Sequence, residues 1–350
     1  MDSAIAPHLR CPRTRTRRIE DDYAPPYPAW STHAAQPVGR VVMAYYGFQS
    51  KGREDHARSC RTLKSFIANF KNPDGPVHYD LAHYVDEEGY DNMIAIAYWT
   101  EPESFARFEG RAAIQEWWAS PERLTDGIGY FKEVVSPEAS GFETLFSGPD
   151  RMEGIGLALG TRTQDDIQEH GYWGSMRDRL AASQTDALSG SGALSTTETP
   201  GFGRRVKIQG HQNVAMIRSG QDWTNTTGKE RDLYLRDMEP ILRSGMDFLR
   251  DSGKVIGCYS NRYMRHVDAA GQPVEKSFGY SYWHSLGEME RWSESHPTHV
   301  AIFGTFMRIV QELNFQLDLR LYHEVSVLRP EEQHFEYVNC HPRTGLMNAL

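Results

Sequence analysis

The sequence has few cysteines and no long apolar run. Its four cysteines are scattered through 350 residues and form no CxxC pair: Cys11, Cys60, Cys258 and Cys340. This spacing argues against a disulfide framework, a zinc ribbon and a covalently attached c-type haem, and the expected location is a reducing cytoplasm. No stretch of 18 or more apolar residues is present, so we expect no transmembrane helix and no membrane partner.

Acidic residues outnumber basic ones, and the common nucleotide-binding motifs are absent. The net charge of -9 argues against a general nucleic-acid binder. The sequence has no GxxxxGK[ST] and no GxSxG motif, and no GxGxxG follows a strand pattern, which disfavours nucleotide binding and serine hydrolysis. Aromatic residues, at 11%, are plentiful enough to line a flat apolar pocket.

Two stretches have the composition of irregular structure. Residues 1–38 are rich in arginine and proline and predict an extended N-terminal arm. Residues 180–203 are small and polar, which predicts a flexible loop inside a connecting segment at 149–208.

The rest of the chain contains an internal repeat. HYVDEEG (83–89) and MIAIAYW (93–99) correspond in order to RHVDAAG (265–271) and SFGYSYW (277–283). Further along, FKEVV (131–135) corresponds to YHEVS (322–326), so that Lys132 stands where the second copy has His323. Several matches in the same order indicate a duplicated structural unit.

Each copy reads as strand, helix, strand, hairpin turn, strand, helix, strand, with VDxxG as the turn. This order is typical of a ferredoxin-like unit. We therefore expect an α+β protein of two fused ferredoxin-like units, at 39–148 and 209–350, with two antiparallel sheets and helices on one face of each. A long helix is expected at 230–253, ending in a glycine C-cap.

Residues 294–303, ESHPTHVAIF, contain two histidines at a helix start. Ser295 is the expected cap and Pro297 falls in the first turn. His299 then shares one helical face with Ile302, Phe303 and Phe306. The pattern is compatible with a packed core histidine, with a zinc pair formed with His296, or with an axial haem ligand. The residues alone leave these alternatives open.

The segment LYHEVSV (321–327) reads as a strand. Alternation puts His323 with two valines on one face, which we expect to point inward, and Tyr322 and Glu324 on the other. His323 lies outside any HExxH zinc motif, because the fourth following residue is Val327. It could be a strand histidine that binds a backbone carbonyl, or a general acid/base near neutral pH.

Three further polar residues are candidates. Arg179 ends EHGYWGSMRDR (169–179) and could be surface charge or an anchor for an oxygen-bearing ligand. Ser219 precedes a glycine and could begin a turn or take part in a site. Glu143, in GFETLF, is either a solvated strand residue or part of the same site.

Together these segments resemble the aldoxime dehydratases, including phenylacetaldoxime dehydratase. The resemblance spans nearly the whole chain. Besides the arginine-rich N-terminus, it includes these particular strings: EHGYWGSMRDR, IRSGQDW (217–223), GMDFLRDSG (245–253), GCYSNR (257–262), ERWSESHPTH (290–299), LYHEVSV and VNCHPRTG (338–345).

The resemblance implies a homodimer with a non-covalent haem b that converts an aldoxime, R-CH=N-OH, to a nitrile and water while the iron is Fe(II). It implies that His299 is the axial ligand to the haem iron. It implies that His323 is the distal acid/base, with Arg179 and Ser219 holding the oxime oxygen and Glu143 tuning His323. The rival functions are a haem peroxidase or dismutase on the same α+β fold, a non-catalytic haem sensor, and a cofactor-free monooxygenase.

Overall fold

The computed structural model describes residues 1–34 and 38–350. The strands and helices of its first half are β1 (Val42–Ser50), α1 (Arg53–Ile67), β2 (His78–Val85), β3 (Asp91–Trp99), α2 (Pro102–Glu109), α3 (Ala112–Ala119), β4 (Gly129–Val135) and β5 (Phe142–Phe146). The connecting segment contains α4 (Ile155–Leu159), α5 (Ser175–Arg179) and β6 (Arg205–Ile208). The second half contains β7 (Val214–Asp222), α6 (Gly228–Leu233), α7 (Glu239–Ser252), β8 (Cys258–Val267), β9 (Pro273–Trp283), α8 (Leu286–Ser295), α9 (Pro297–Glu312), β10 (Arg320–Leu328) and β11 (Gln333–Val338).

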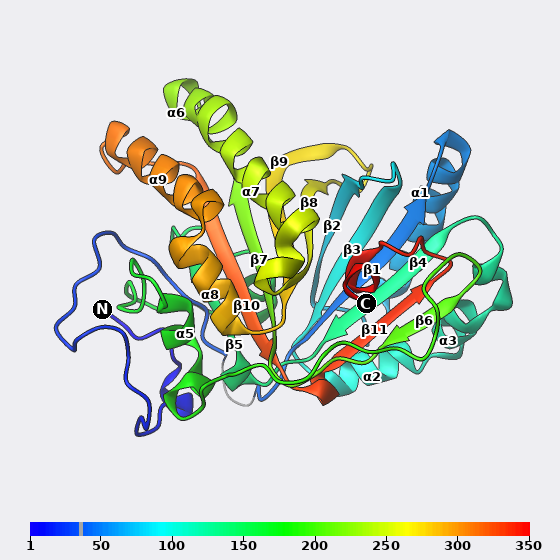
Figure 1. Ribbon diagram of the computed structural model, residues 1–350, viewed down its shortest axis with the longest axis horizontal. Coiled ribbons are helices and arrows are strands. Elements are labelled where there is room, and N and C mark those ends of the chain that lie inside the picture. Colours follow the sequence, from blue (N-terminus) through cyan, green and yellow to red (C-terminus); the bar gives the residue numbers. More distant parts are fainter. Residues whose placement is uncertain (35–37) are drawn as a thin grey trace.

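The described strands form one antiparallel sheet of eleven, in the order β5-β10-β7-β9-β8-β2-β3-β1-β4-β11-β6. Within it, β4-β1-β3-β2 and β10-β7-β9-β8 are two copies of the same four-stranded arrangement. Helices α1–α3 cover one half and α6–α9 the other, on opposite sides of the view in Figure 1. The α+β class and the two ferredoxin-like units are therefore confirmed.

The expected two separate sheets are instead one continuous sheet, for two reasons. The edge strands β2 and β8 pair at Leu81–Val267, Ala82–His266 and His83–Arg265. In addition, β5 of the first half pairs with β10, while β11 of the second half pairs with β4. Each half thus gives its last strand to the other, and this covers edges that would otherwise stay open.

The two VDxxG turns have the same hydrogen bonds, which confirms the internal repeat. The Asp86 carboxylate accepts from the backbone N–H groups two and four residues later, at 3.1 and 2.9 Å. Asp268 does the same at 2.8 and 2.9 Å. Gly89 and Gly271 both have positive φ, at 77° and 82°. Aspartate and glycine occur here because the turn needs a side-chain acceptor and a left-handed residue.

The inner faces of the two halves pack on each other, with Tyr45 stacked on Tyr280 at 4.1 Å between ring centroids. Buried ion pairs cross this interior. Arg218 donates to Asp80 at 2.7 Å, and Arg262 donates to Glu133 at 2.9 Å. Because the inner faces are packed against each other, the helices and any ligand site lie on the outer faces of the sheet.

The helix expected at 230–253 is interrupted. A π-helical turn, Tyr234–Met238, separates α6 from α7. It ends two residues before Pro240, which has no N–H to donate and clashes with a regular preceding turn. Gly253 is the C-cap of α7 as expected, but its φ is -61°; the left-handed glycine is Gly257, at φ 89°, which ends the following 3-10 turn.

The N-terminal arm runs over the connecting segment near α5 (Figure 1). Its regular structure is a 3-10 turn at Pro7–Leu9, and residues 35–37 of the expected arm lie outside the described residues. The boundaries at 38, 148 and 208 stay predictions. None of the described helices is both long enough and apolar enough to cross a membrane.

Candidate functional site

His299 lies in the first turn of α9, and its ring is oriented by the end of α8. The Nδ1 atom lies 2.7 Å from the carbonyl oxygen of Ser293. A carbonyl can only accept, so Nδ1 carries the hydrogen and the lone pair of Nε2 is free to bind a metal. The Ser293 carbonyl is available because the last carbonyls of a helix have no intrahelical donor. Burial lowers the pKa of His299 to about 4, so the ring is neutral at pH 7.

His296 has a different role from the one a zinc pair requires. It is the N-cap of α9, and its Nδ1 accepts from the backbone N–H of Thr298. Its ring stacks on Phe248 at 4.2 Å. The prediction that Ser295 caps this helix is wrong, because the Ser295 hydroxyl donates to the Arg291 carbonyl in the last turn of α8. Pro297 begins the helix as expected.

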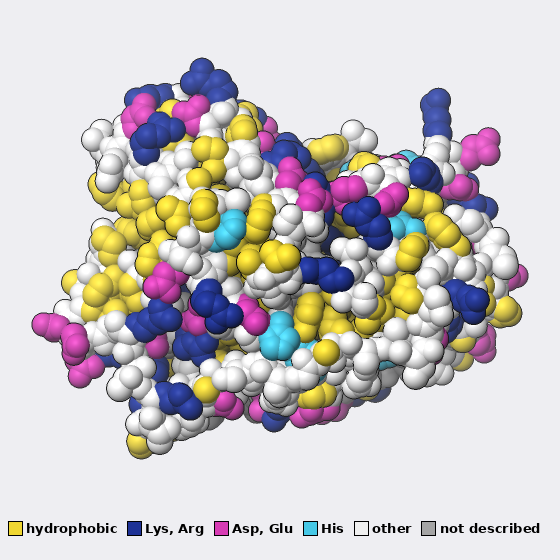
Figure 2. Space-filling model, viewed as in Figure 1, with side chains coloured by type: hydrophobic (Ala, Val, Ile, Leu, Met, Phe, Trp, Pro, Cys, Tyr) yellow, Lys and Arg dark blue, Asp and Glu magenta, His cyan; other side chains and the backbone are white. Residues whose placement is uncertain are grey.

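The apolar face of α9 is only partly covered by protein. Phe303 is 37% exposed, and Ile302 and Phe306 are half-buried, as is His299. Trp173 packs beside this face, with ring centroids 5.7 Å from His299 and 5.1 Å from Phe303. Figure 2 shows hydrophobic side chains gathered on the surface over α8 and α9. The helix face expected to pack in the core therefore forms an accessible apolar wall beside the free Nε2.

His323 and Ser219 are directly opposite each other on β10 and β7. Opposite residues point to the same face of a sheet, so both side chains lie on the helix-covered side. His323 shares this face with Val325 and Val327, as alternation predicted, while Tyr322 faces the interior between the halves. Ser219 lies inside β7 and does not begin a turn, because the strand continues to Asp222.

The equivalent position in the first half contains a closed polar cluster. Tyr46 and Lys132 are opposite each other on β1 and β4, at the places of Ser219 and His323 in the repeat. Both donate to Glu109, at 2.7 and 2.6 Å. Within the described chain, the Ser219 hydroxyl and the His323 ring have no such protein partner. At this pair of equivalent positions, the described residues therefore leave polar groups free for a ligand in the second half but not in the first.

Arg179 and Glu143 form a buried ion pair next to His323. Nε and Nη2 of Arg179 donate to the two carboxylate oxygens of Glu143 at 2.6 and 2.8 Å. Arg179 is 3% exposed and Glu143 is 4% exposed. The alternatives of a surface charge for Arg179 and a solvated strand residue for Glu143 are therefore wrong. On β5, Leu145 is opposite His323, and Glu143 lies two residues before Leu145. The Glu143 carboxylate contacts Arg179 and not His323.

The pKa of His323 links these groups. Burial is the main cause that lowers it to about 3, and the positive charge of Arg179 and that of His299, when its ring is protonated, act in the same direction. A nearby positive charge disfavours the protonated ring, so Arg179 and His299 lie close enough to His323 to act on its pKa. The sequence-predicted residues His299, His323, Arg179, Ser219 and Glu143 are thus brought together from α9, β10, α5, β7 and β5.

Two residues of the site carried no signal of their own in the sequence. His170 is 1% exposed, and neither ring nitrogen has a partner among the described residues. Burial, with the charge of Arg179, lowers its pKa to about 4. Tyr27, from the N-terminal arm, packs on its ring at 5.2 Å. Only the fold connects these residues, because 143 positions separate them in the chain.

Comparison with known proteins agrees with this geometry. The model of the family described as haem-containing dehydratase matches residues 44–346. The chain belongs to the haem-containing dehydratase family. An aliphatic aldoxime dehydratase of Rhodococcus globerulus is 47% identical over 99% of this chain and 98% of its own length. A phenylacetaldoxime dehydratase of Bacillus sp. (strain OxB-1) is 34% identical, over 95% and 94%.

Solved structures of the family have the same fold. An aldoxime dehydratase in complex with butyraldoxime superimposes with a TM-score of 0.95, at 45% identity, and covers 99% of this chain and 96% of that one. A second aldoxime dehydratase gives a TM-score of 0.94 at 44% identity, covering 99% and 98%. The resemblance noted in the sequence is therefore confirmed, and with it a haem cofactor.

The residues present fit a haem of this family. A flat macrocycle needs an axial donor, an apolar surface and room between helix and sheet. His299 has its Nε2 free, Phe303 and Trp173 line an accessible apolar wall, and Ser219 and His323 lie on the facing sheet. In the first half, by contrast, aromatic side chains fill the layer between helices and sheet, with Phe66 and Trp117 at 5.3 Å.

Proposed function

We propose that this haem-containing dehydratase converts aliphatic aldoximes to nitriles and water. The observation that carries the proposal is the pairing of Ser219 with His323 on one sheet face, next to the buried Arg179–Glu143 pair. The aliphatic preference follows from the relatives, since an aliphatic aldoxime dehydratase of Pseudomonas chlororaphis is 45% identical, against 34% for the phenylacetaldoxime enzyme.

His299 would hold the haem through Nε2, with the Ser293 carbonyl fixing the ring. When bound, the haem would supply an iron centre that activates the N–O bond of the oxime. Phe303 and Trp173 would keep water from the macrocycle, because both rings are apolar and pack against each other.

Ser219 and His323 would act on the oxime itself. The Ser219 hydroxyl is free to hydrogen-bond the oxime oxygen and orient it toward His323. Dehydration delivers one proton to the departing OH and removes one proton from carbon, so one imidazole can serve both transfers. His323 is neutral in the protein alone, since its pKa is about 3. Its protonated form therefore belongs to the complex with substrate, and the pH dependence of kcat reports it.

Arg179 would set the charge around His323 and help to hold the oxime oxygen. Glu143 offsets the positive charge of Arg179 through two hydrogen bonds. Glu143 would thus tune His323 through Arg179.

The haem is proposed to be haem b, bound without covalent attachment and active as Fe(II). The enzyme is proposed to be a cytoplasmic homodimer, which analytical ultracentrifugation of the purified protein would test.

One experiment tests the function. Purified protein loaded with haem and reduced with dithionite under argon is mixed with butyraldoxime or phenylacetaldoxime, and nitrile is measured. We expect a shift of the Soret band on binding, nitrile formation that requires the reductant, and faster turnover of butyraldoxime. Turnover of hydrogen peroxide by the ferric protein without any nitrile formation would instead support the peroxidase alternative.

A further inference from the structure

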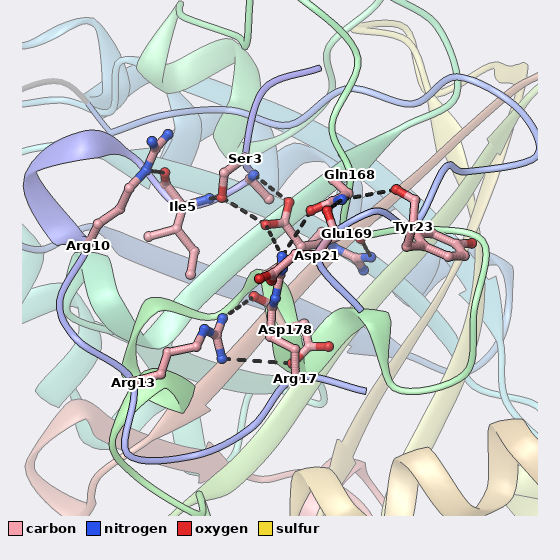
Figure 3. Close-up of polar contacts among 12 residues, drawn as sticks. Ser3, Ile5, Arg10, Arg13, Arg17, Asp21, Tyr23, Gln168, Glu169 and Asp178 are labelled. Atoms are coloured by element: carbon pink, nitrogen blue, oxygen red, sulfur yellow. Dashed lines mark hydrogen bonds and ion pairs between the residues drawn. The ribbon is translucent and has the colours of Figure 1, made fainter. Parts of the chain in front are cut away.

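The N-terminal arm contacts the segment that carries Arg179 along much of its length. Residues 164–184 contain only two short helical turns, at Ser175–Arg179 and Ala181–Gln184. A segment with so little internal hydrogen bonding depends on its surroundings for a fixed conformation. Figure 3 shows the arm supplying many of these contacts.

Glu169 connects the start of the arm with Arg179. Its carboxylate is 3% exposed and accepts from the Ser3 hydroxyl at 2.8 Å and from the Ala4 backbone N–H at 2.9 Å. Its backbone carbonyl in turn accepts from Nη1 of Arg179 at 3.0 Å. A shift of Glu169 would therefore move a hydrogen-bond acceptor of the Arg179 guanidinium.

Asp178 makes a second connection, from the residue directly before Arg179. Its carboxylate, 3% exposed, accepts from the backbone N–H of Arg18 at 3.1 Å and from the Tyr172 hydroxyl at 2.9 Å. Arg13 donates to the Asp178 carbonyl at 3.3 Å. A buried carboxylate is costly without such donors, so the arm fixes this residue in place.

Arg17 holds the same segment from the middle of the arm. It donates to the Gln168 side-chain oxygen at 2.9 Å, and its Nη1 lies 3.8 Å from the Glu169 carboxylate. The Gln168 amide donates to the Tyr23 carbonyl at 2.9 Å, which returns the contact to the arm. In addition, Arg18 forms an ion pair with Glu294 at 3.2 Å, on the helix that precedes His299.

We propose that residues 2–23 of the arm are a clamp that positions Arg179 through Glu169 and Asp178. The arm residues in it are positioning residues. The role of Arg179 toward substrate rests on the proposed function, whereas the clamp itself can be measured in the haem-free protein. A loosened clamp lets Arg179 move away from His323, and this removes a positive charge that holds the His323 pKa down.

The chain offers a matched pair of variants. Arg17→Gln and Arg15→Gln each remove one positive charge from the arm, but the Arg15 side chain is exposed and has no polar contact with the described residues. Ser3→Ala removes a different donor to Glu169, without a charge change, and is a milder second variant. Amide hydrogen exchange by mass spectrometry follows 164–184 in each haem-free protein, and NMR titration follows the His323 pKa.

We expect Arg17→Gln and Ser3→Ala to speed exchange at 164–184 by about tenfold, as for the loss of one hydrogen bond to a charged group. The His323 pKa should rise in both, and kcat for butyraldoxime should fall with little change in KM. Arg15→Gln should change none of these.

Unchanged exchange in both test variants would overturn the clamp, and so would faster exchange with an unchanged His323 pKa. Absence of aldoxime turnover in the unmodified enzyme would refute only the proposed function, since exchange and pKa still judge the clamp.

Discussion

The guanidinium of Arg179 and the carboxylate of Glu143 meet in a buried, two-pronged ion pair at 2.6 and 2.8 Å. Neither group reaches solvent, so each depends on the other. Removing one partner of such a pair leaves a buried charge without compensation, which is more damaging than replacing both. Arg179 is close enough to His323 to act on its pKa.

Arg179→Gln should destabilise the haem-free protein by about 3–5 kcal/mol, the typical cost of an unpaired buried charge. The free energy of unfolding from urea titrations measures this. The double variant Arg179→Gln/Glu143→Gln should recover part of the loss, because no charge is then left buried. Equal stability of the single variant and the unmodified protein would contradict the pairing.

The same two positions should shift the pKa of His323 in opposite directions. Without the charge of Arg179, the imidazolium is less disfavoured and the pKa rises. Glu143→Gln leaves the Arg179 charge uncompensated, so the pKa falls further. NMR titration of the His323 ring in haem-free protein distinguishes these outcomes, and shifts of the same sign in both variants would count against this electrostatic account.

His299→Ala should abolish stable haem binding, whereas His296→Ala should leave it intact. The two histidines are three residues apart, but only His299 has an Nε2 free beside the apolar wall, while His296 caps the helix. The Soret absorbance per protein after haem loading and gel filtration measures the difference. Added imidazole should restore part of the spectrum of His299→Ala. Full haem retention in that variant would exclude the axial role.

His323→Ala should keep haem and lower kcat by about 10²–10⁴-fold, the usual contribution of one general acid/base. Ser219→Ala should lower kcat by about tenfold, since it removes one neutral hydrogen bond. Anaerobic nitrile formation with reduced enzyme gives both values. A near-normal kcat for His323→Ala would remove this residue from the proton transfers.

The haem-free protein should lose stability as the pH falls from about 6.5 toward 4. The folded-state pKa of His170 is about 4 and that of His266 about 3, both lowered by burial, so unfolding lets these rings take up protons. Each contributes a slope of up to about 1.4 kcal/mol per pH unit. His170→Phe keeps a ring against Tyr27 and should flatten the slope measured by urea unfolding at pH 7 and 5. His8→Phe, at an exposed position, serves as the control.

Much of the fold was predictable because its signals are local. Residue alternation identified the strand at 321–327. The VDxxG turns form as expected because Asp86 and Asp268 accept from the backbone N–H groups two and four residues later in the turn. The exchange of β5 and β11 between the halves was missed, since no local pattern specifies which edge a short strand will join.

The sequence by itself determined the duplicated units and the start of α9 at Pro297, and its resemblance to the family predicted the residues proposed for the site. Only the tertiary structure decided how those residues are used. It placed Glu143 on Arg179, 36 positions away, and the first residues of the arm on Glu169, 166 positions from Ser3. It also aimed Nδ1 of His299 at the Ser293 carbonyl. Turn chemistry and alternation act between near neighbours, whereas partners for buried charges are chosen by whichever distant segments pack together.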